Sequence, residues 1–163
     1  MAKIRNPKPI TVDWVGSRRR EIFLDHLVKQ RQWQVGIEVG VRFGRVLFHL
    51  LDNNPELHMY AVDQDISQFY TPAVQQRYGS RLTVLEGISW EQAKAVTETV
   101  DFVFIDAGHG QKSVVRDIQT YSPLLRTPQG LTGHDVDFPA VQAALDQCHI
   151  VYDVGPDNVW LQR

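Results

Sequence analysis

Acidic side chains follow apolar runs at several places in this chain, and they are the residues best suited to chemistry. Glu38, Asp63 and Asp106 each stand at the end of a short apolar run typical of a strand. Ser89 and Asp135 follow two further runs. Because the carboxyl ends of parallel strands share one edge of a sheet, we expect these groups to converge, although they are far apart in the sequence. Carboxylates gathered in one crevice would attract a cationic ligand or a divalent ion.

The stretch VGIEVGVRFGRVLFHLL, residues 35–51, organises the rest of the chain. It reads as a strand, a turn bracketed by Gly40 and Gly44, and a helix whose apolar residues recur at helical spacing. Such a turn places glycine where the backbone bends tightly and leaves bare N–H groups at the helix start, where a ligand can dock. A strand, turn and helix that bind no ligand are the alternative for this stretch alone.

Glu38 indicates which ligand the turn would bind. A carboxylate at the end of the feeding strand repels a pyrophosphate but attracts a ligand that carries an ammonium and a sulfonium group. Arg42 also occupies the place of the second glycine in the dinucleotide pattern G-x-G-x-x-G. Asp63 stands 25 positions after Glu38 (63 − 38). Nucleotide-binding α/β folds place an acid that accepts hydrogen bonds from a ribose at a similar distance.

Strand-like and helix-like segments alternate along the chain. We expect strands at residues 35–39, 57–62, 81–85, 100–105 and 129–132, and a closing hairpin of residues 149–154 and 159–162. Helices are expected from Ser17 to about residue 32, after Gly44, from Ser67 to about Gly79, from Ser89 to about 99, at 113–125, and from Asp137 to about Cys148. This alternation predicts an α/β fold with a mostly parallel sheet and one antiparallel strand.

Length and composition predict one domain over residues 1–163, with residues 1–16 as an N-terminal arm. The net charge of −2 gives no general attraction to nucleic acid or to an anionic membrane. A single cysteine, Cys148, and the absence of an apolar leader or of an 18-residue apolar run predict a cytoplasmic protein. The run Arg18-Arg19-Arg20 is interpreted as a solvated helix face, with a polyanion site as the alternative.

Five stretches follow one another in a fixed order: IEVGVRFGRVLFHLL, YAVDQD, VLEGISWEQA, DFVFIDAGHGQKSVVRDI and GHDVDFPAVQAAL. As an ordered set they resemble the class I S-adenosylmethionine-dependent methyltransferases, in the small branch that contains many O-methyltransferases. The resemblance covers most of the chain from Val35 onward. It implies a Rossmann-like sheet of seven strands in the order 3-2-1-4-5-7-6, with the last strand antiparallel and helices on both faces.

The resemblance also implies which residues contact S-adenosylmethionine: Glu38, Gly40, Gly44, Asp63, Gly87, Ile88, Ser89 and Asp106. The first three would hold the methionine end, and Asp63 would accept hydrogen bonds from the ribose. The next three would flank the adenine, and Asp106 would lie beside the transferred methyl group.

A hydroxyl acceptor must lose its proton, and two catalytic routes remain open. In the first, His109 acts as general base, because histidine is the side chain whose ordinary pKa lies nearest to neutral pH. In the second, Asp106 and Asp135 hold a divalent ion such as Mg²⁺, with His134 beside them. The resemblance supports the metal route, since catechol-type relatives bind magnesium with carboxylates at these two strand ends.

Three kinds of function compete at this point. The leading hypothesis is a methyltransferase that acts on a small molecule, at a hydroxyl oxygen, with room for a homo-oligomer that completes the site. The second is a methyltransferase-like binding module that has kept the cofactor pocket and lost turnover. The third is a nicotinamide-dependent oxidoreductase, which Glu38 and the missing second glycine disfavour.

Overall fold

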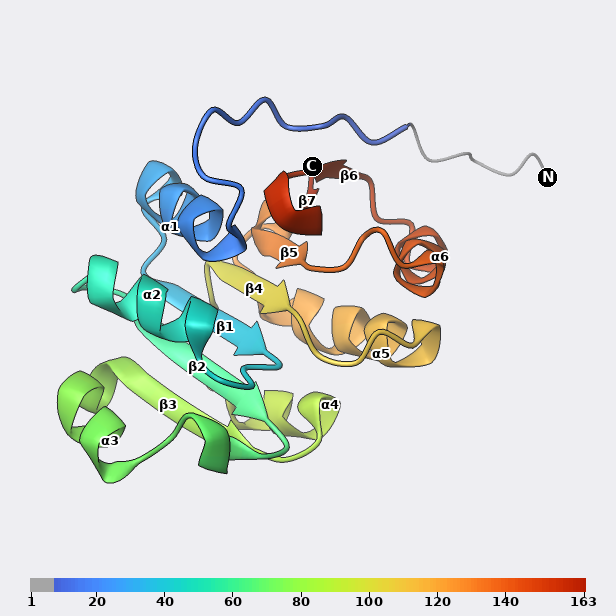
Figure 1. The fold of residues 1–163 in the computed structure, drawn as a ribbon. Coiled ribbons are helices and arrows are strands. Elements are labelled where there is room, and N and C mark those ends of the chain that lie inside the picture. Colours follow the sequence, from blue (N-terminus) through green and yellow to red (C-terminus); the bar gives the residue numbers. More distant parts are fainter. Residues whose placement is uncertain (1–7) are drawn as a thin grey trace.

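Seven strands form one sheet in the order β3-β2-β1-β4-β5-β7-β6, in a computed structural model that describes residues 8–163 (Figure 1). The strands are β1 (Val35–Val39), β2 (His58–Asp63), β3 (Leu82–Glu86), β4 (Phe102–Ile105), β5 (Leu131–Gly133), β6 (Tyr152–Val154) and β7 (Trp160–Gln162). Strand β7 runs antiparallel to both of its neighbours, and the other paired strands are parallel. The expected strand order and the expected antiparallel strand are therefore confirmed.

Helices cover both faces of the sheet (Figure 1). They are α1 (Arg20–Arg31), α2 (Arg45–Asn53), α3 (Pro72–Tyr78), α4 (Ser89–Gln92), α5 (Gln111–Tyr121) and α6 (Pro139–Gln147). Alternate residues of a strand point to opposite faces, so β1 and β4 serve two cores. Ile37 and Val103 pack with α5 and α6, whereas Phe102 and Phe104 pack with α1 and α2. Strands β1 and β4, in the middle of the sheet, are thus held by close packing on both faces.

Two expected helix starts lie outside the helices that form. The hydroxyl of Ser17 accepts from the backbone N–H of Arg19 at 3.3 Å, and α1 begins only at Arg20. Phe138 occupies the N-cap position of α6, with Pro139 as the first helical residue, so Asp137 is not the cap. In both places a polar side chain near the helix start bonds locally or faces solvent instead of capping the helix.

The helix expected to begin at Ser67 is split into two parts. Asp65 accepts from the backbone N–H of Ser67 and closes a single 3₁₀ turn, Ile66–Gln68. Helix α3 begins four residues later, where the hydroxyl of Thr71 accepts from the N–H of Val74. Its end at Gly79 agrees with the expectation.

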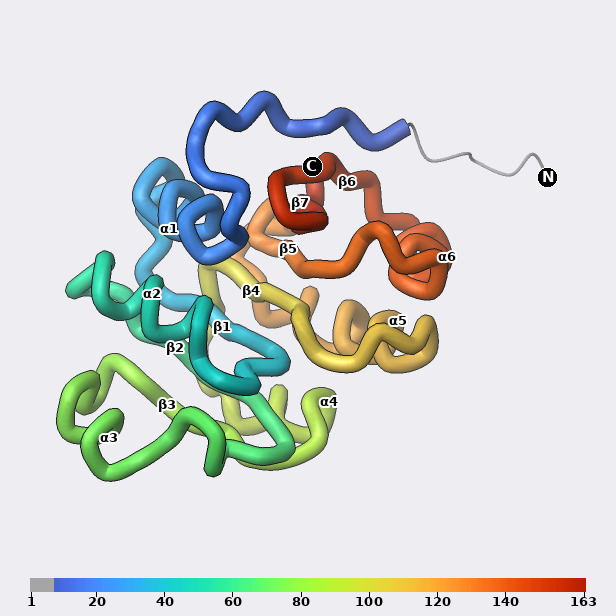
Figure 2. The backbone as a smooth tube through the Cα atoms, viewed as in Figure 1, coloured from blue at the N-terminus to red at the C-terminus, as the bar shows by residue number. Residues whose placement is uncertain are grey.

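The part of the N-terminal arm that the structure describes, residues 8–16, runs beside the closing hairpin (Figure 2). Thr11 forms a parallel bridge with Val154, and the N–H of Val12 donates to the carbonyl of Val154 at 2.7 Å. Residues 1–7 of the predicted arm lie outside the described part of the chain. The arm thus lies against β6, at the edge of the sheet opposite β3.

Within residues 8–163, no helix combines the length and the hydropathy that crossing a bilayer requires. Cys148 follows directly after α6, is half-buried and carries a free thiol. Burial raises the pKa of this thiol above its ordinary value, which makes it a weak nucleophile.

Candidate functional site

The carboxyl edge of the sheet brings together polar groups from four neighbouring strands. Gly40 follows β1, Asp63 ends β2, Asp106 follows β4 and His134 follows β5. All four residues line cavities at this edge, although almost 100 positions separate the first from the last. The strand order places β1 between β2 and β4, which is why these distant segments meet.

Two adjoining cavities open at this edge. The first has a volume of about 350 Å³ and is lined by Asp63, Gly87, Ser89 and Trp90, among others. The second, of about 360 Å³, is lined by residues from the start of α1, the glycine turn, the start of α2 and the loops that follow β4 and β5. Both cavities are lined by Gly40, Arg42, Asp106 and Ala107, so they meet at the glycine turn.

Asp63 holds the glycine turn in place. Its Oδ2 accepts from the backbone N–H groups of Val41 at 2.8 Å and of Arg42 at 2.7 Å. Its backbone carbonyl accepts from the N–H of Gly87 at 2.9 Å, which ties β2 to the turn after β3. Its Oδ1 accepts only a longer bond, of 3.1 Å, from the N–H of Asp65. Asp63 therefore has a structural role that its position in the sequence did not predict, and Oδ1 is its less occupied oxygen.

Glu38 is a buried carboxylate without enough partners. Its side chain lies on β1 under the glycine turn and lines the second cavity, yet the residue is only 2% exposed. Its Oε2 has no hydrogen-bond partner. Burial, followed by the negative charge of Asp106, raises the pKa of Glu38 well above its ordinary value. A cation in the second cavity would favour the ionised form of Glu38 and so lower its pKa.

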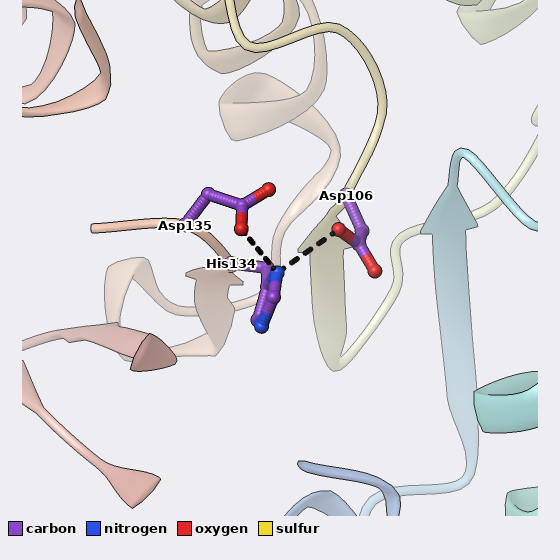
Figure 3. Close-up of side chains that lie close together, drawn as sticks. All are labelled: Asp106, His134 and Asp135. Carbon is purple, nitrogen blue, oxygen red and sulfur yellow. Dashed lines mark ion pairs between the residues drawn. The ribbon is translucent and has the colours of Figure 1, made fainter. Parts of the chain in front are cut away.

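A second group of acids and histidines lies where β4 and β5 end (Figure 3). The Nδ1 atom of His134 lies 3.3 Å from Oδ1 of Asp106 and 2.9 Å from Oδ1 of Asp135. Burial acts to lower the pKa of His134, but the hydrogen bond and charge of Asp106, with the charge of Asp135, outweigh burial and leave this pKa raised. The two carboxylates therefore favour the protonated form of His134.

His109 approaches the same group from the loop after β4. Its Nδ1 atom lies 2.8 Å from Oδ2 of Asp135, and its ring stacks on Phe138 with the ring centroids 5.2 Å apart. The side chain of His109 is 49% exposed at the mouth of the second cavity. Asp135 favours a proton on the nearby Nδ1, and the free electron pair then lies on Nε2, which is the arrangement of a general base.

Arg20, at the start of α1, completes this group. Its guanidinium lies 3.4 Å from Oδ2 of Asp106 and 3.5 Å from Oδ2 of Asp157, in the turn of the closing hairpin. Close contacts between basic and acidic side chains thus run from Arg20 through Asp106, His134 and Asp135 to His109. The hairpin turn positions Arg20, so the end of the chain takes part in building the site.

The structure does not bring every predicted residue to the cavities. Gly44 is the N-cap of α2, with a φ of 76°, and lines neither cavity. Ile88 is 37% exposed and also lines neither. Trp90 lines the first cavity, although the sequence did not assign it to the cofactor-binding residues. Arg20 was interpreted as part of a solvated face, and no signal in the sequence shows that the start of α1 reaches the site.

Ser89 does not cap α4 as expected. It is the first residue of the helix, after Ile88 at the N-cap, and its hydroxyl donates to Oδ1 of the buried Asp117 at 2.5 Å. The hydroxyl of Tyr121 donates to the backbone carbonyl of Ser89, also at 2.5 Å. Helix α5 therefore fixes α4, which contributes Ser89 and Trp90 to the first cavity. Helix α4 is also shorter than expected, because it passes into a 3₁₀ turn at residues 93–95.

Asp117 makes a testable contribution to the dependence of stability on pH. Burial raises its pKa to about 6, above the unfolded value of about 3.9. The native state thus holds a proton that the unfolded chain has lost, so this stabilisation is complete below about pH 4 and disappears as pH rises through about 6. The unfolding free energy of the wild type, relative to Asp117→Asn, is expected to fall by about 2–3 kcal/mol between pH 4 and pH 7. Urea unfolding of both proteins at several pH values measures this free-energy difference. A difference that stays constant with pH would contradict the raised pKa of Asp117.

The sheet order defines a Rossmann-like α/β protein, with two adjoining cavities at the carboxyl edge of the sheet. A family model described as a methyltransferase domain matches residues 37–136, which is more than half of the chain. The chain belongs to this family of methyltransferase domains. No curated protein sequence matches it.

Solved structures share the fold. A Staphylococcus aureus protein assigned as a caffeoyl-CoA O-methyltransferase is 15% identical, with a TM-score of 0.70 over 92% of this chain and 86% of that one. An O-methyltransferase from Bacillus cereus, in complex with SAH, is 15% identical, with a TM-score of 0.68 over 93% and 84%. CalS11, a TDP-rhamnose 3′-O-methyltransferase, is 16% identical, with a TM-score of 0.67 over 88% and 78%. At these identities the likeness concerns the fold alone.

Proposed function

We propose that this methyltransferase uses S-adenosylmethionine and transfers the methyl group to a hydroxyl oxygen of a small molecule. The observation that carries the proposal is the unpartnered Oε2 of the buried Glu38, which lines the second cavity together with Asp106. A buried carboxylate that lacks a partner is costly unless a ligand supplies the missing cation. S-adenosylmethionine carries two such groups, an ammonium and a sulfonium.

The two cavities fit the two ends of this cofactor. The first cavity offers Trp90 and Ser89 to the adenine and Oδ1 of Asp63 to the ribose. The second offers Glu38 to the ammonium group of the methionine end. Asp106 lines both cavities, at the place where the sulfonium would lie. The relative from Bacillus cereus, which contains SAH, is consistent with this proposal.

Asp63→Ala is expected to weaken binding of S-adenosylhomocysteine by about 1–3 kcal/mol, because the ribose loses a charged hydrogen-bond acceptor. The glycine turn loses the bonds from Val41 and Arg42 at the same time. Isothermal titration calorimetry measures the dissociation constant. Asp65→Ala is the matched control, since Asp65 lies on the same turn and its side chain bonds, among the described residues, to Ser67 and Gln68 of the 3₁₀ turn. An unchanged dissociation constant in Asp63→Ala would refute the ribose assignment.

In the proposed reaction, bound S-adenosylmethionine supplies the methyl group, and the protein aligns the acceptor and removes its proton. Alignment at near-attack distance can contribute up to about 7–11 kcal/mol. Nε2 of His109 takes the hydroxyl proton, and Asp135 holds the ring in the required tautomer and stabilises the imidazolium that forms. Phe138 fixes the plane of the imidazole ring by stacking on it.

The metal route fits these residues less well. Asp106, His134 and Asp135 offer ligand atoms within 4.8 Å of one another. Mg²⁺, however, prefers oxygen ligands in octahedral geometry, and an imidazole nitrogen suits zinc or iron. The nitrogen between the two carboxylates also belongs to a histidine whose pKa is raised, so a proton competes with any metal there. The donor set does not fit Mg²⁺, and we derive no step through it.

Two measurements test the proposed function. Calorimetry with S-adenosylmethionine, S-adenosylhomocysteine and NAD is expected to show binding of the first two compounds only. Binding of NAD alone would favour the oxidoreductase instead. A screen for transfer of a labelled methyl group to small hydroxyl compounds, with EDTA or with Mg²⁺, then separates enzyme from binding module. Turnover that persists in EDTA supports the base route, a requirement for Mg²⁺ contradicts it, and binding without any turnover supports the inactive module.

Other expectations remain proposals. The names of two relatives, caffeoyl-CoA O-methyltransferase and TDP-rhamnose 3′-O-methyltransferase, support a small-molecule acceptor and no nucleic-acid partner. We also propose a single domain, a cytoplasmic location and a homo-oligomer that completes the acceptor site. Size-exclusion chromatography with light scattering measures the oligomeric state.

A further inference from the structure

The second cavity has a wall rich in arginine, built by the start of α1 and by the segment from the glycine turn into α2. Arg20, Arg42 and Arg45 all line this cavity. Arg19 joins them through Glu21, to which both Arg19 and Arg45 bind. The same cavity is also lined by Asp106, Asp135 and the two histidines. Of the arginine run in the sequence, Arg20 lines this cavity, whereas Arg18 and Arg19 are exposed, so the run is a solvated face only in part.

These arginines have different numbers of partners. Arg20 is shared between Asp106 and Asp157, so its charge is balanced within the site. Glu21 is 1% exposed, and Arg19 and Arg45 both bind its Oε1. Burial acts to raise the pKa of Glu21, but its backbone N–H and the two arginines outweigh burial and lower this pKa, so Glu21 stays ionised. Two positive charges on one carboxylate leave one positive charge in excess.

Arg42 adds a second excess charge. Its guanidinium lies over the ring of Phe43, with 4.9 Å from Cζ to the ring centroid. Within residues 8–163 it forms no ion pair with a carboxylate. The backbone of Arg42 has a φ of 53°, a conformation that non-glycine residues adopt rarely and that recurs at functional sites. Asp63 holds this conformation through the backbone N–H.

The proposed cofactor would balance only part of the excess positive charge of these arginines. Its ammonium group would be paired with Glu38, and its single carboxylate would balance one of the two excess positive charges. Arg42 lines both cavities and is placed for that carboxylate, whereas Arg45 lines the second cavity alone. Arg45 and Arg19 are 52% and 58% exposed, so a ligand can reach the charge that remains.

We propose that the methyl acceptor carries a carboxylate or phosphate group, which Arg45, assisted by Arg19, binds at the α1–α2 end of the second cavity. This inference rests on the proposed function and names the class of its acceptor: a small hydroxylated anion. The arginine fork suits carboxylate and phosphate oxygens. With the anionic group held at Arg45, the acceptor extends across the cavity toward His109.

The carboxylate of the cofactor could also bind these arginines. The experiment therefore separates binding of the cofactor carboxylate from binding of an anionic acceptor. Inorganic phosphate is titrated calorimetrically into the free protein and into the protein saturated with S-adenosylhomocysteine. Because S-adenosylhomocysteine brings its own carboxylate, phosphate that still binds to the complex occupies the acceptor side. We expect phosphate to bind the complex, and Arg45→Gln to weaken this binding about tenfold.

Two further variants make the test specific. Arg77→Gln is the matched control, because it removes the same charge from an exposed arginine paired with Asp52, away from both cavities. It should leave phosphate binding within about twofold, because distant surface charges are screened. Glu21→Gln removes the carboxylate that occupies Arg45 and should strengthen phosphate binding about two- to threefold.

Each other result overturns the inference. Phosphate that binds only the free protein, and is displaced by S-adenosylhomocysteine, would assign the arginines to the cofactor. No phosphate binding, or an equal loss in Arg45→Gln and Arg77→Gln, would exclude the site. If S-adenosylhomocysteine does not bind, the proposed function is contradicted. That result is distinguishable, because calorimetry with S-adenosylhomocysteine alone gives it without phosphate.

Discussion

His109→Gln is expected to lower the rate of methyl transfer by about 10²–10⁴-fold, the usual contribution of a positioned general base. The expected dissociation constant for S-adenosylhomocysteine stays within about twofold, because the proposed cofactor contacts are made by Glu38, Asp63, Ser89 and Trp90 and not by His109. Glutamine cannot take up a proton at this position, although it can still donate a hydrogen bond to Asp135. The loss should therefore fall on kcat, measured by transfer of a labelled methyl group under single-turnover conditions.

His49→Gln is the matched control for this prediction. His49 lies on α2, is half-buried and lines neither cavity, so its replacement should leave kcat unchanged. Asp135→Asn should give an intermediate loss, since it removes the charge that orients His109 at 2.8 Å. A kcat in His109→Gln equal to that of the wild type would exclude His109 as the general base. It would favour the alternative in which Asp106, His134 and Asp135 are metal ligands.

Gly40→Ala is expected to lower the unfolding free energy by about 2–4 kcal/mol and to weaken binding of S-adenosylhomocysteine more than about tenfold. Gly40 has a φ of +89°, and an added Cβ would lie 2.5 Å from the carbonyl oxygen of Asp106 and 2.6 Å from Cα of Ala107. Both contacts are with backbone, which cannot move without shifting the loop after β4. Urea unfolding measures the first effect, and calorimetry measures the second.

Gly79→Ala separates backbone conformation from this close approach. Gly79 also has a positive φ, of +55°, but a Cβ there would have no neighbour within 4 Å. Its replacement should cost only the conformational term of about 1–3 kcal/mol, without an effect on ligand binding. Equal losses of stability in the two variants would mean that the contact between the glycine turn and the loop after β4 is unimportant.

The strand and helix pattern carried most of the information about the fold. Val35 to Val39 alternates β-branched residues with Gly36 and Glu38, and the structure forms β1 over that stretch. The final hairpin around Gly155 also forms as expected. These predictions depend on periodicity, which reports directly which side chains a strand or helix can bury.

The start points of helices were predicted less well, for a local reason. Ser17, Ser67 and Ser89 are all good capping residues by type, and none of them caps an α-helix here. A hydroxyl or carboxylate can bond to any nearby donor, and the choice depends on what else is packed around it. For Ser89 the competing partner is Asp117, 28 positions away.

By itself, the sequence determined that carboxylates would stand at the carboxyl ends of strands, because strand periodicity and parallel order place Glu38, Asp63 and Asp106 there. Only the tertiary structure decided their partners. Arg20 reaches Asp106 because the turn of the closing hairpin holds α1 through Asp157, and His109 meets Asp135 because β4 and β5 are neighbours. Periodicity records which face a residue occupies, whereas such contacts depend on how distant elements pack together.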